Sequence, residues 1–297
     1  MSAEPSESGA QEQSRIGELI IVPTPIGNLG DVSLRAIEVL ASVDAILCED
    51  TRVTAKLLRR HDIHRSLISY HEHNAERMRP KVLQRLRHGE SLALVSDAGT
   101  PLVSDPGFKL LRAALAENIR VTALPGPSAV LTALVVSGLP TNRFFFAGFL
   151  PAKAAQRRSE LSELSAIPAT LIFFETAQRL PAALADMAGI LGPRPAAVAR
   201  ELTKLFEEVH RAELSALAVH FATSGPPRGE VVVVVGPPAK LSRSDDLNLD
   251  EAIGQALSRL RLRDAVDAVA ATTGMPRRRI YARALQLAGK PARGDSD

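Results

Sequence analysis

Short apolar runs alternate with helical patterns along the first half of the chain, and this alternation restricts the fold more than any other feature. The apolar runs lie at residues 19–22, 45–48, 92–95 and 121–124. Each run is followed by a loop and then by a segment with helical spacing of apolar residues. Strands that alternate with helices in this way form a mostly parallel sheet with helices on both faces. The sequence therefore predicts an α/β fold.

The segment at residues 94–108, L-V-S-D-A-G-T-P-L-V-S-D-P-G-F, contains two glycines, two prolines and two aspartates between a strand and a helix. A simple turn needs far fewer turn-forming residues. Gly99 and Gly107 allow the backbone to approach a ligand, and Pro101 and Pro106 hold the loop in one shape. Open α/β sheets bind ligands at the carboxyl ends of their strands. We therefore predict that this segment is a ligand-binding loop.

Several other strand ends carry polar loops, and in a parallel sheet all of these ends share one edge. The loops read P-T-P-I-G-N, E-D-T-R, H-E-H-N and P-G-P-S. Their convergence predicts a site built from several loops at that edge.

The sequence lacks the signatures of several common sites. No dinucleotide G-x-G-x-x-G, phosphate-binding G-x-x-x-x-G-K-[ST] or G-x-S-x-G motif occurs. His71 and His73 with one Glu are too few ligands for a typical catalytic zinc site, so no metal is expected. Cys48 is the single cysteine and lies in an apolar strand, which predicts a buried, inert thiol.

Length and composition predict about two domains in a chain of 297 residues with 45% hydrophobic residues. No apolar stretch approaches the ~20 residues that a membrane-spanning helix requires. The N-terminus is polar and has no apolar core, so it does not resemble a signal peptide. We expect a cytoplasmic protein with a disordered tail at residues 1–15, an N-terminal parallel α/β domain at 16–124 and a mixed α/β domain at 125–238.

The texture of the sequence changes after residue 238. Residues 239–297 read as a polar linker followed by three short helical patterns, the outline of a helix-turn-helix module. Arg277, Arg278 and Arg279 open its last helix. They indicate a nucleic-acid contact, although a basic capping bundle or a dimer contact is also compatible with the pattern.

Further basic residues cluster around two of the loops, whereas the net charge of the whole chain is only +3. Such clusters suit a rim that binds phosphates. The residues predicted to contact RNA are Lys56, Arg59, Arg77, Arg157, Arg158, Arg277, Arg278 and Arg279.

Eight short motifs, found in one chain and in a fixed order, resemble those of a known family. They are L-I-I-V-P-T-P-I-G-N-L-G-D, C-E-D-T-R, Y-H-E-H-N, S-D-A-G-T-P-L-V-S-D-P-G, L-P-G-P-S-A, G-F-L-P, F-F-E-T and A-R-E-L-T-K. Over residues 19–238 the chain resembles the small-subunit ribosomal RNA methyltransferase I family of the tetrapyrrole methylase superfamily. The C-terminal helices resemble that family's helix-turn-helix extension.

This resemblance implies a two-domain tetrapyrrole-methylase-like fold, the class III S-adenosylmethionine methyltransferase fold, in a homodimer. It also implies 2′-O-methylation of a cytidine in the decoding region of 16S rRNA, in the small ribosomal subunit. Asp97 and Thr100 occupy the region of a G-D-P turn in relatives, and residues 228–230 would close the adenine side. The cofactor-lining residues carried over by motif are Pro25, Asp97, Gly99, Thr100, Pro101, Val103, Ser128, Ala129, Phe173 and Phe174.

Methyl transfer to a hydroxyl requires in-line positioning and removal of the hydroxyl proton. From loop position and residue type, we predict Asp50, His71 and His73 as alternative proton acceptors. Arg52 and Asn74 would orient the ribose and its phosphate. Three other acidic residues are expected only to brace loops through backbone N–H groups. These are Glu49, Asp105 and Glu175.

Three alternatives remain at this stage. The first is methylation of a tetrapyrrole or another small substrate, which needs fewer cations than the sequence supplies. The second is an RNA-binding ribosome-assembly factor without turnover. The third, a nicotinamide oxidoreductase, lacks the glycine fingerprint.

Overall fold

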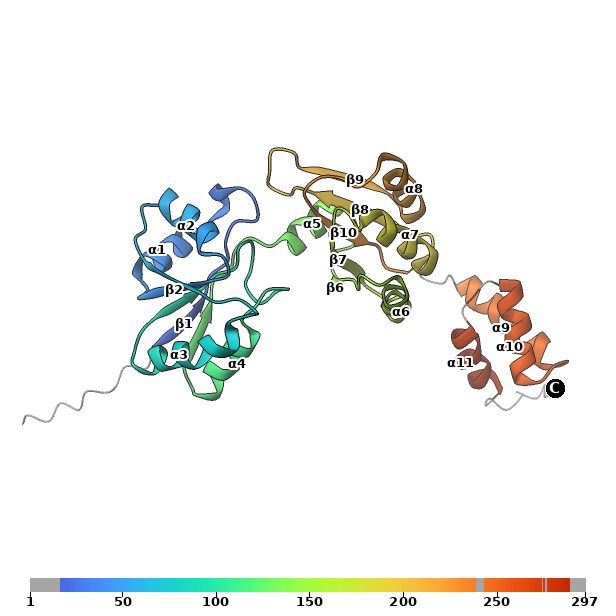
Figure 1. Ribbon diagram of the computed structural model, residues 1–297. Coiled ribbons are helices and arrows are strands. Elements are labelled where there is room, and N and C mark those ends of the chain that lie inside the picture. Colours follow the sequence, from blue (N-terminus) through green and yellow to red (C-terminus); the bar gives the residue numbers. More distant parts are fainter. Residues whose placement is uncertain (1–16, 239–242, 274, 276, 289–297) are drawn as a thin grey trace, which may run out of the picture. The chain divides into compact units, whose positions relative to one another are not determined.

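The computed structural model describes residues 17–238, 243–273, 275 and 277–288 (Figure 1). The chain divides into two compact units, Met1–Pro238 and Ala239–Asp297. The predicted α/β class and the C-terminal helical extension are confirmed. The tail predicted at residues 1–15 lies outside the described residues, and the domain boundary predicted at 124/125 stays a prediction.

The first sheet has five parallel strands in the order β3-β2-β4-β1-β5. Its strands are β1 (Glu18–Ile21), β2 (Ala45–Cys48), β3 (Ser66–Ser69), β4 (Leu92–Leu94) and β5 (Arg120–Ala123). The helices between them are a short 3-10 helix η1 (Leu29–Asp31), α1 (Leu34–Ser42), α2 (Thr51–Arg60), α3 (Ala75–Arg87) and α4 (Phe108–Ala116). The loops after β1 and β4, two neighbouring central strands, therefore open at the same edge.

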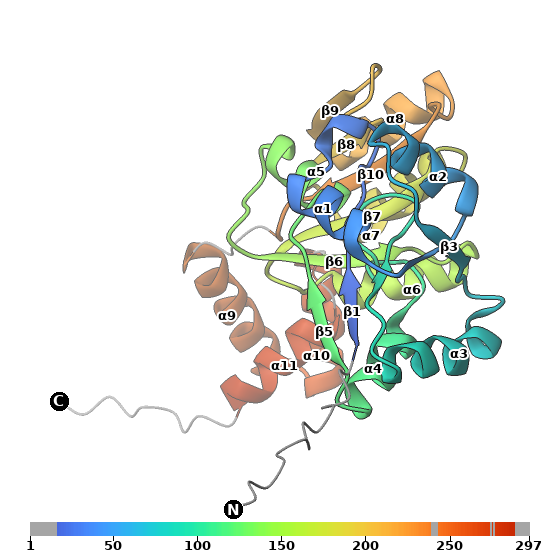
Figure 2. The same cartoon turned by 90° about the vertical axis from the view of Figure 1, so that its left-hand side faces the viewer.

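Strand residues of the first sheet alternate between two hydrophobic clusters. In β4, Leu92 and Leu94 pack against α3 and α4, whereas Ala93 contacts the cluster that contains α1 and α2. Figures 1 and 2 show the two helix pairs on opposite sides of the sheet. Because both faces are covered, the strands read as continuous apolar runs in the sequence.

The second sheet has the order β6-β7-β10-β8-β9. The pair β6–β7 is parallel, and the other three pairs are antiparallel, so this sheet is mixed. Its strands are β6 (Phe144–Phe149), β7 (Thr170–Thr176), β8 (Pro195–Arg200), β9 (Glu208–Glu213) and β10 (Glu230–Val235). The helices are α5 (Ala129–Ser137), α6 (Ala154–Leu164), α7 (Leu180–Leu191) and α8 (Leu214–Ser224).

The two faces of the second sheet have different coverings. Phe173 of β7 belongs to the cluster formed with α6, α7 and α8, and its side chain is 0% exposed. Its neighbour Phe174 lies on the opposite face, in the cluster of α5, and that cluster also contains Ile26 from the loop after β1. The α5 face of the second sheet thus meets a loop of the first sheet.

The C-terminal unit consists of three helices, α9 (Arg243–Leu257), α10 (Leu262–Thr273) and α11 (Arg277–Ala288). Its small core contains Ile253, Val266 and Ile280, one from each helix. Arg283 donates to Asp250 at 2.7 Å and ties α11 to α9. Among the described helices of both units, none is long and apolar enough to cross a membrane.

Phe173→Ala should lower the free energy of unfolding by about 3–5 kcal/mol, because it removes a fully buried ring and leaves a cavity. Urea unfolding followed by circular dichroism measures this change. Phe173→Leu is the control and should cost clearly less. Equal stability of the alanine variant and the parent protein would contradict the burial of this ring.

Candidate active site

The loops after β1 and β4 are joined by a two-way backbone pairing. The N–H of Thr24 donates to the carbonyl of Gly99 at 2.9 Å, and the N–H of Gly99 donates to the carbonyl of Thr24 at 3.0 Å. The Thr24 hydroxyl also donates to the carbonyl of Ser96 at 3.0 Å. These bonds fix the predicted ligand loop against the first loop of the chain.

The segment between Gly99 and Gly107 has an unusual backbone. Gly99 and Gly107 have φ of 79° and 128°, and Leu102 and Ser104 have positive φ of 75° and 65°. Positive φ is costly for residues with a side chain. A Cβ on Gly107 would also lie 2.8 Å from a methyl carbon of Leu94. The loop therefore has a shape that glycine permits at both ends.

A third loop, between β5 and α5, completes the edge. The Thr100 hydroxyl donates to the carbonyl of Pro127 at 3.1 Å. Ser128 follows and caps α5, accepting a hydrogen bond from the N–H of Leu131. The predicted convergence of loops is present here, because residues after β1, β4 and β5 contact one another.

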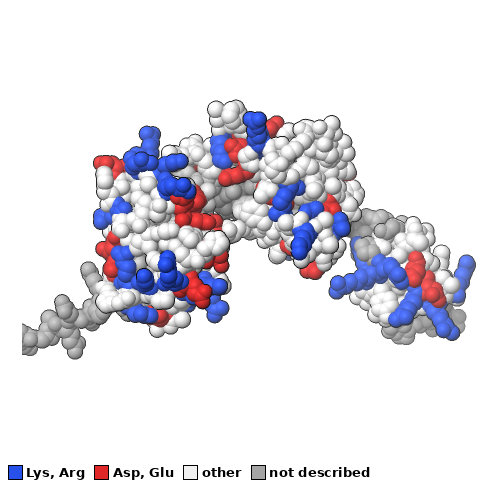
Figure 3. All heavy atoms as spheres, in the orientation of Figure 1, with Lys and Arg blue, Asp and Glu red and all other residues white. Residues whose placement is uncertain are grey.

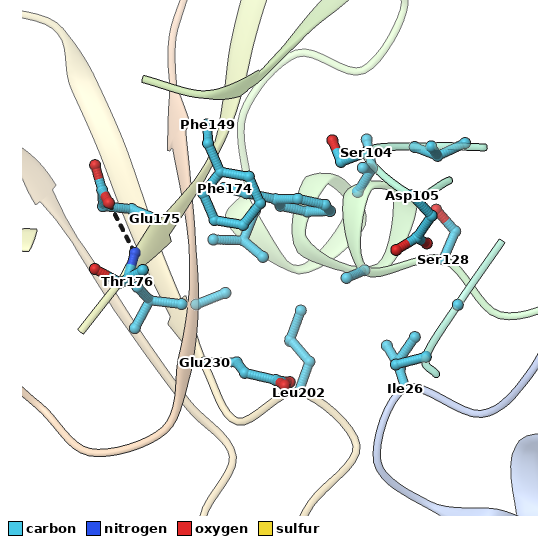
Figure 4. Close-up of a pocket in the computed structure, with 18 of the residues that line it drawn as sticks. Ile26, Ser104, Asp105, Ser128, Phe149, Phe174, Glu175, Thr176, Leu202 and Glu230 are labelled. Carbon is cyan, nitrogen blue, oxygen red and sulfur yellow. Dashed lines mark hydrogen bonds between the residues drawn. The ribbon is translucent and has the colours of Figure 1, made fainter. Parts of the chain in front are cut away.

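A cavity of about 360 Å³ lies between this edge and the α5 face of the second sheet (Figure 4). Its volume is in the range of small-molecule sites. The rings of Phe149 and Phe174 meet edge to face, with centroids 5.5 Å apart. The remaining lining comes mainly from residues 98–100, 103–105, 128–130, 174–177 and 229–232.

Six of the ten residues predicted to line a cofactor lie on this cavity. They are Gly99, Thr100, Val103, Ser128, Ala129 and Phe174. Gly229 and Glu230 also line it, at the position expected to close the adenine side.

The other four predicted residues lie elsewhere. Pro25 and Asp97 line a neighbouring hollow of about 210 Å³, which shares Ile26, Ala98 and Glu230 with the cavity. Pro101 is buried within the loop. Phe173 needs a correction, because successive residues of β7 face opposite sides of the sheet and its ring is buried on the far face.

The predicted catalytic residues gather in a third, more open hollow. Asp50, Arg52, His71 and His73 line it, and Asp97 lines both this hollow and the second one. Asn74 braces the backbone of this hollow, because its side-chain amide accepts from the N–H of His71 and donates to the carbonyl of Ser69, each at 3.0 Å. The second hollow therefore adjoins the cavity on one side and the third hollow on the other.

Asp50 is held tightly in this third hollow. Its carboxylate accepts from the Arg52 side chain at 2.6 Å and from the Arg52 backbone N–H at 2.8 Å. Hydrogen bonds from Arg52 lower the pKa of Asp50 to about 2. A carboxylate with so low a pKa is a weak proton acceptor.

Asp105 was expected only to brace its loop, but the structure places it on the wall of the cavity. Burial and the nearby charges of Glu49 and Asp97 raise the pKa of Asp105 to about 6. The sequence signal available was its position in the predicted ligand loop, between Gly99 and Gly107.

Comparison with known proteins places the chain in a family. A family model described as Tetrapyrrole (Corrin/Porphyrin) Methylases matches residues 18–218, and one described as RsmI C-terminal HTH domain matches residues 243–288. Ribosomal RNA small subunit methyltransferase I of Mesorhizobium japonicum is 48% identical over 93% of this chain and 94% of its own length. The protein of that name from Escherichia coli O157:H7 is 43% identical, over 92% and 96%. The chain belongs to the ribosomal RNA small subunit methyltransferase I family.

Solved structures agree on the fold. A cobalamin biosynthetic enzyme, cobalt precorrin-4 methyltransferase, matches with a TM-score of 0.58 and 16% identity, over 77% of this chain and 98% of its own. Diphthine synthase matches with a TM-score of 0.57 and 15% identity, over 74% and 90%. The resemblance and the two-domain tetrapyrrole-methylase-like fold predicted from the motifs are confirmed.

Membership of the methyltransferase I family makes the chain a methyltransferase. This excludes the nicotinamide oxidoreductase considered at first. A factor without turnover and a methylase of small tetrapyrroles are both less compatible with relatives of this identity and name. Within the described residues no cluster of three or more His, Cys, Asp or Glu side chains could hold a metal.

The basic residues predicted to bind RNA differ in accessibility. Lys56, Arg59 and Arg77 are exposed on α2 and α3, and Figure 3 shows Lys and Arg side chains over the helices of the first sheet. Arg278 and Arg279 are exposed at the start of α11. Arg277 is also exposed there and forms an ion pair with Asp267.

Arg157 corrects the sequence prediction. Its side chain is only 6% exposed and forms an ion pair with Asp186 at 2.6 Å, so it is not available to RNA. Arg158, the next residue, is 54% exposed and 3.5 Å from the same aspartate. Only Arg158 of this pair remains a predicted RNA contact.

Arg157→Ala should destabilise the fold by about 3 kcal/mol, because it leaves Asp186 without its buried partner. Arg158→Ala, on the exposed side, should change stability by less than about 0.5 kcal/mol. Chemical unfolding of both variants measures the difference. The assignment fails if Arg158→Ala is the more destabilising of the two.

Proposed function

We propose that this methyltransferase transfers the methyl group of S-adenosylmethionine to the ribose 2′-hydroxyl of a cytidine in the decoding region of 16S rRNA. The substrate would be the assembled small ribosomal subunit. Family membership supports methyl transfer to small-subunit rRNA. The observation that carries the proposal for this chain is the mainly apolar cavity with adjoining hollows, of which the third is lined by the exposed Arg52.

The cavity fits S-adenosylmethionine by its chemistry. Apolar and aromatic side chains, among them Phe149, Phe174 and Leu202, suit the adenine ring. The Asp105 carboxylate suits the positive charge of a sulfonium. The prolines at 101 and 106 remove two N–H donors from the loop, which disfavours a phosphate cradle and leaves carbonyl groups to face a cation.

The cofactor supplies a methyl group that is already activated by the charge on its sulfur. The residues of this chain have to hold the acceptor hydroxyl in line with the methyl carbon and sulfur and to remove its proton. We propose that Arg52 and Asn74 orient the ribose-phosphate chain at the third hollow. His71 and His73 lie at that hollow and not on the cofactor cavity, so their part in proton transfer depends on the acceptor ribose reaching them.

RNA would be held by cations outside the cavity. The exposed residues proposed for this role neutralise phosphates and make binding dependent on salt. They are Lys56, Arg59, Arg77, Arg158, Arg277, Arg278 and Arg279.

A homodimer and a cytoplasmic location are also part of the proposal. Helix α5 supports the homodimer, because it is apolar on all sides and its outer face is exposed. Leu131 and Val135 on that face are 51% and 70% exposed. Exposed apolar faces of this kind are typical of protein interfaces.

Purified protein should methylate small ribosomal subunits from a strain that lacks the enzyme, with S-adenosylmethionine as donor. The expected product is one 2′-O-methylcytidine per subunit in the decoding region, mapped by mass spectrometry of rRNA fragments. Subunits from the parent strain, already modified, are the control. Methyl incorporation into a porphyrinogen but not into rRNA would refute the proposal.

Phe174→Ala should weaken binding of S-adenosylhomocysteine by about tenfold, because the ring that forms the cavity wall is lost. Isothermal titration calorimetry measures the affinity. Phe173→Leu is the matched control from the opposite face of β7 and should leave the affinity unchanged. Equal effects of the two variants would show that the cavity is not the cofactor site.

A further inference from the structure

Three carboxylates line the cavity in the part of the chain that the structure describes, and two of them are paired with cations. Glu175 forms an ion pair with Arg179 at 3.2 Å and accepts from the N–H of Thr176 at 2.8 Å. Glu230 lies 3.0 Å from the Lys204 ammonium. Each of these two carboxylates therefore has a cation in direct contact, although burial still raises the pKa of Glu175.

Asp105 has the opposite environment. Its carboxylate points into the cavity in Figure 4, and its charged neighbours are the carboxylates Glu49, after β2, and Asp97, after β4. The nearby Ser96 hydroxyl favours the charged form, but it does not offset burial and the two like charges. Burial and like charges together disfavour the ionised carboxylate, and so favour uptake of a proton.

The loop backbone holds Asp105 in this place. Leu102 and Ser104, just before it, have positive φ, and such conformations persist only where the surrounding structure enforces them. The enforcement comes from the Thr24–Gly99 pairing and from the Thr100 hydrogen bond to Pro127. Asp105 is thus presented to the cavity by a fixed loop.

We propose that Asp105 is the catalytic base of the methyl transfer, accepting the proton of the acceptor hydroxyl. This inference rests on the proposed function and names the proton acceptor within the same site. It differs from the sequence-based candidates Asp50, His71 and His73, which line the outer hollow.

The step balances without any further reactant. The hydroxyl oxygen forms a bond to the methyl carbon, and the bond from that carbon to sulfur breaks and leaves its electron pair on the sulfur. The hydroxyl proton passes to the Asp105 carboxylate. A methyl ether, a neutral thioether and a protonated Asp105 result, and Asp105 later releases the proton to water.

The charge change of the reaction favours this direction of proton transfer. Before the step, a sulfonium in the cavity stabilises the ionised carboxylate, which is the form that can accept a proton. After the step the sulfur is neutral, and Glu49 and Asp97 again favour the protonated form. The same carboxylate is therefore ionised when a proton has to be accepted and protonated once the methyl group has left.

Asp105→Asn tests the proposal. At pH 8 with saturating cofactor and small subunits, kcat should fall by about 10²–10³-fold, the usual contribution of a general base. Affinity for S-adenosylhomocysteine, which carries no sulfonium charge, should change by less than about threefold. Asp105→Glu, which keeps a carboxylate, should restore part of the lost kcat.

The dependence on pH gives a readout that a structural role would not change. Activity of the parent protein, as kcat/KM for the cofactor, should decline as the pH falls through about 6, because Asp105 becomes protonated. Glu49→Gln removes one of the charges that favour this protonation, so the decline should move to lower pH. Asp105→Asn should lack this decline.

Stability distinguishes loss of chemistry from loss of folding. The folded-state pKa of Asp105 is raised, so its favourable contribution to stability exists at low pH and is lost as the pH rises through about 6. Asp105→Asn should therefore melt at a higher temperature than the parent protein at pH 8, while it is far less active. A lower melting temperature would contradict the proposal.

Two further outcomes would overturn it. Full kcat with weakened cofactor binding would make Asp105 a cofactor ligand only, and unchanged kinetics would give it no role. In both cases the parent protein still methylates the small subunit. Absence of methylation by the parent protein would instead refute the proposed function, so the two failures are distinguishable.

Discussion

The pairing of Thr24 with Gly99 is the contact on which the site depends. Its two backbone hydrogen bonds join the loops that follow β1 and β4, two strands far apart in the sequence and adjacent in the sheet. The paired loops present Ile26 and Asp105 to the same cavity. Backbone pairing is insensitive to side-chain identity, so the frame of the site can stay constant while the residues on it determine the chemistry.

The same frame connects the two sheets within the first unit. Ile26 packs into the cluster of α5 and the second sheet. The N–H of Asn28 donates to the Thr203 hydroxyl at 3.1 Å, and a Cβ on Gly27 would lie 2.5 Å from the side chain of Lys204. The loop after β1 therefore lines the cavity through Ile26 and also contacts residues 203 and 204, which follow β8 of the second sheet.

Local patterns in the sequence were sufficient for the fold and for the loops of the site. The alternation of apolar runs and helical patterns predicted a sheet covered on both faces. Gly99 and Gly107, predicted to let the backbone approach a ligand, are two of the four positive-φ residues between 99 and 107. They were not sufficient where a distant partner decides the outcome. Arg157 is buried by Asp186, which lies 29 positions later in the chain. Strand register, which short apolar runs do not define, separates Phe173 from Phe174.

Asp105 is the clearest case of information that only the folded chain contains. In the sequence it is one of several acidic loop residues. Its proton affinity depends on burial, on Glu49 from the end of β2, and on Asp97 at the start of its own loop. Burial of Asp105 next to these two carboxylates destabilises the protein without a ligand, and a bound cation relieves that cost. The charges that weaken the fold are therefore the ones that favour binding of a sulfonium and prepare the site to accept a proton once that charge is lost.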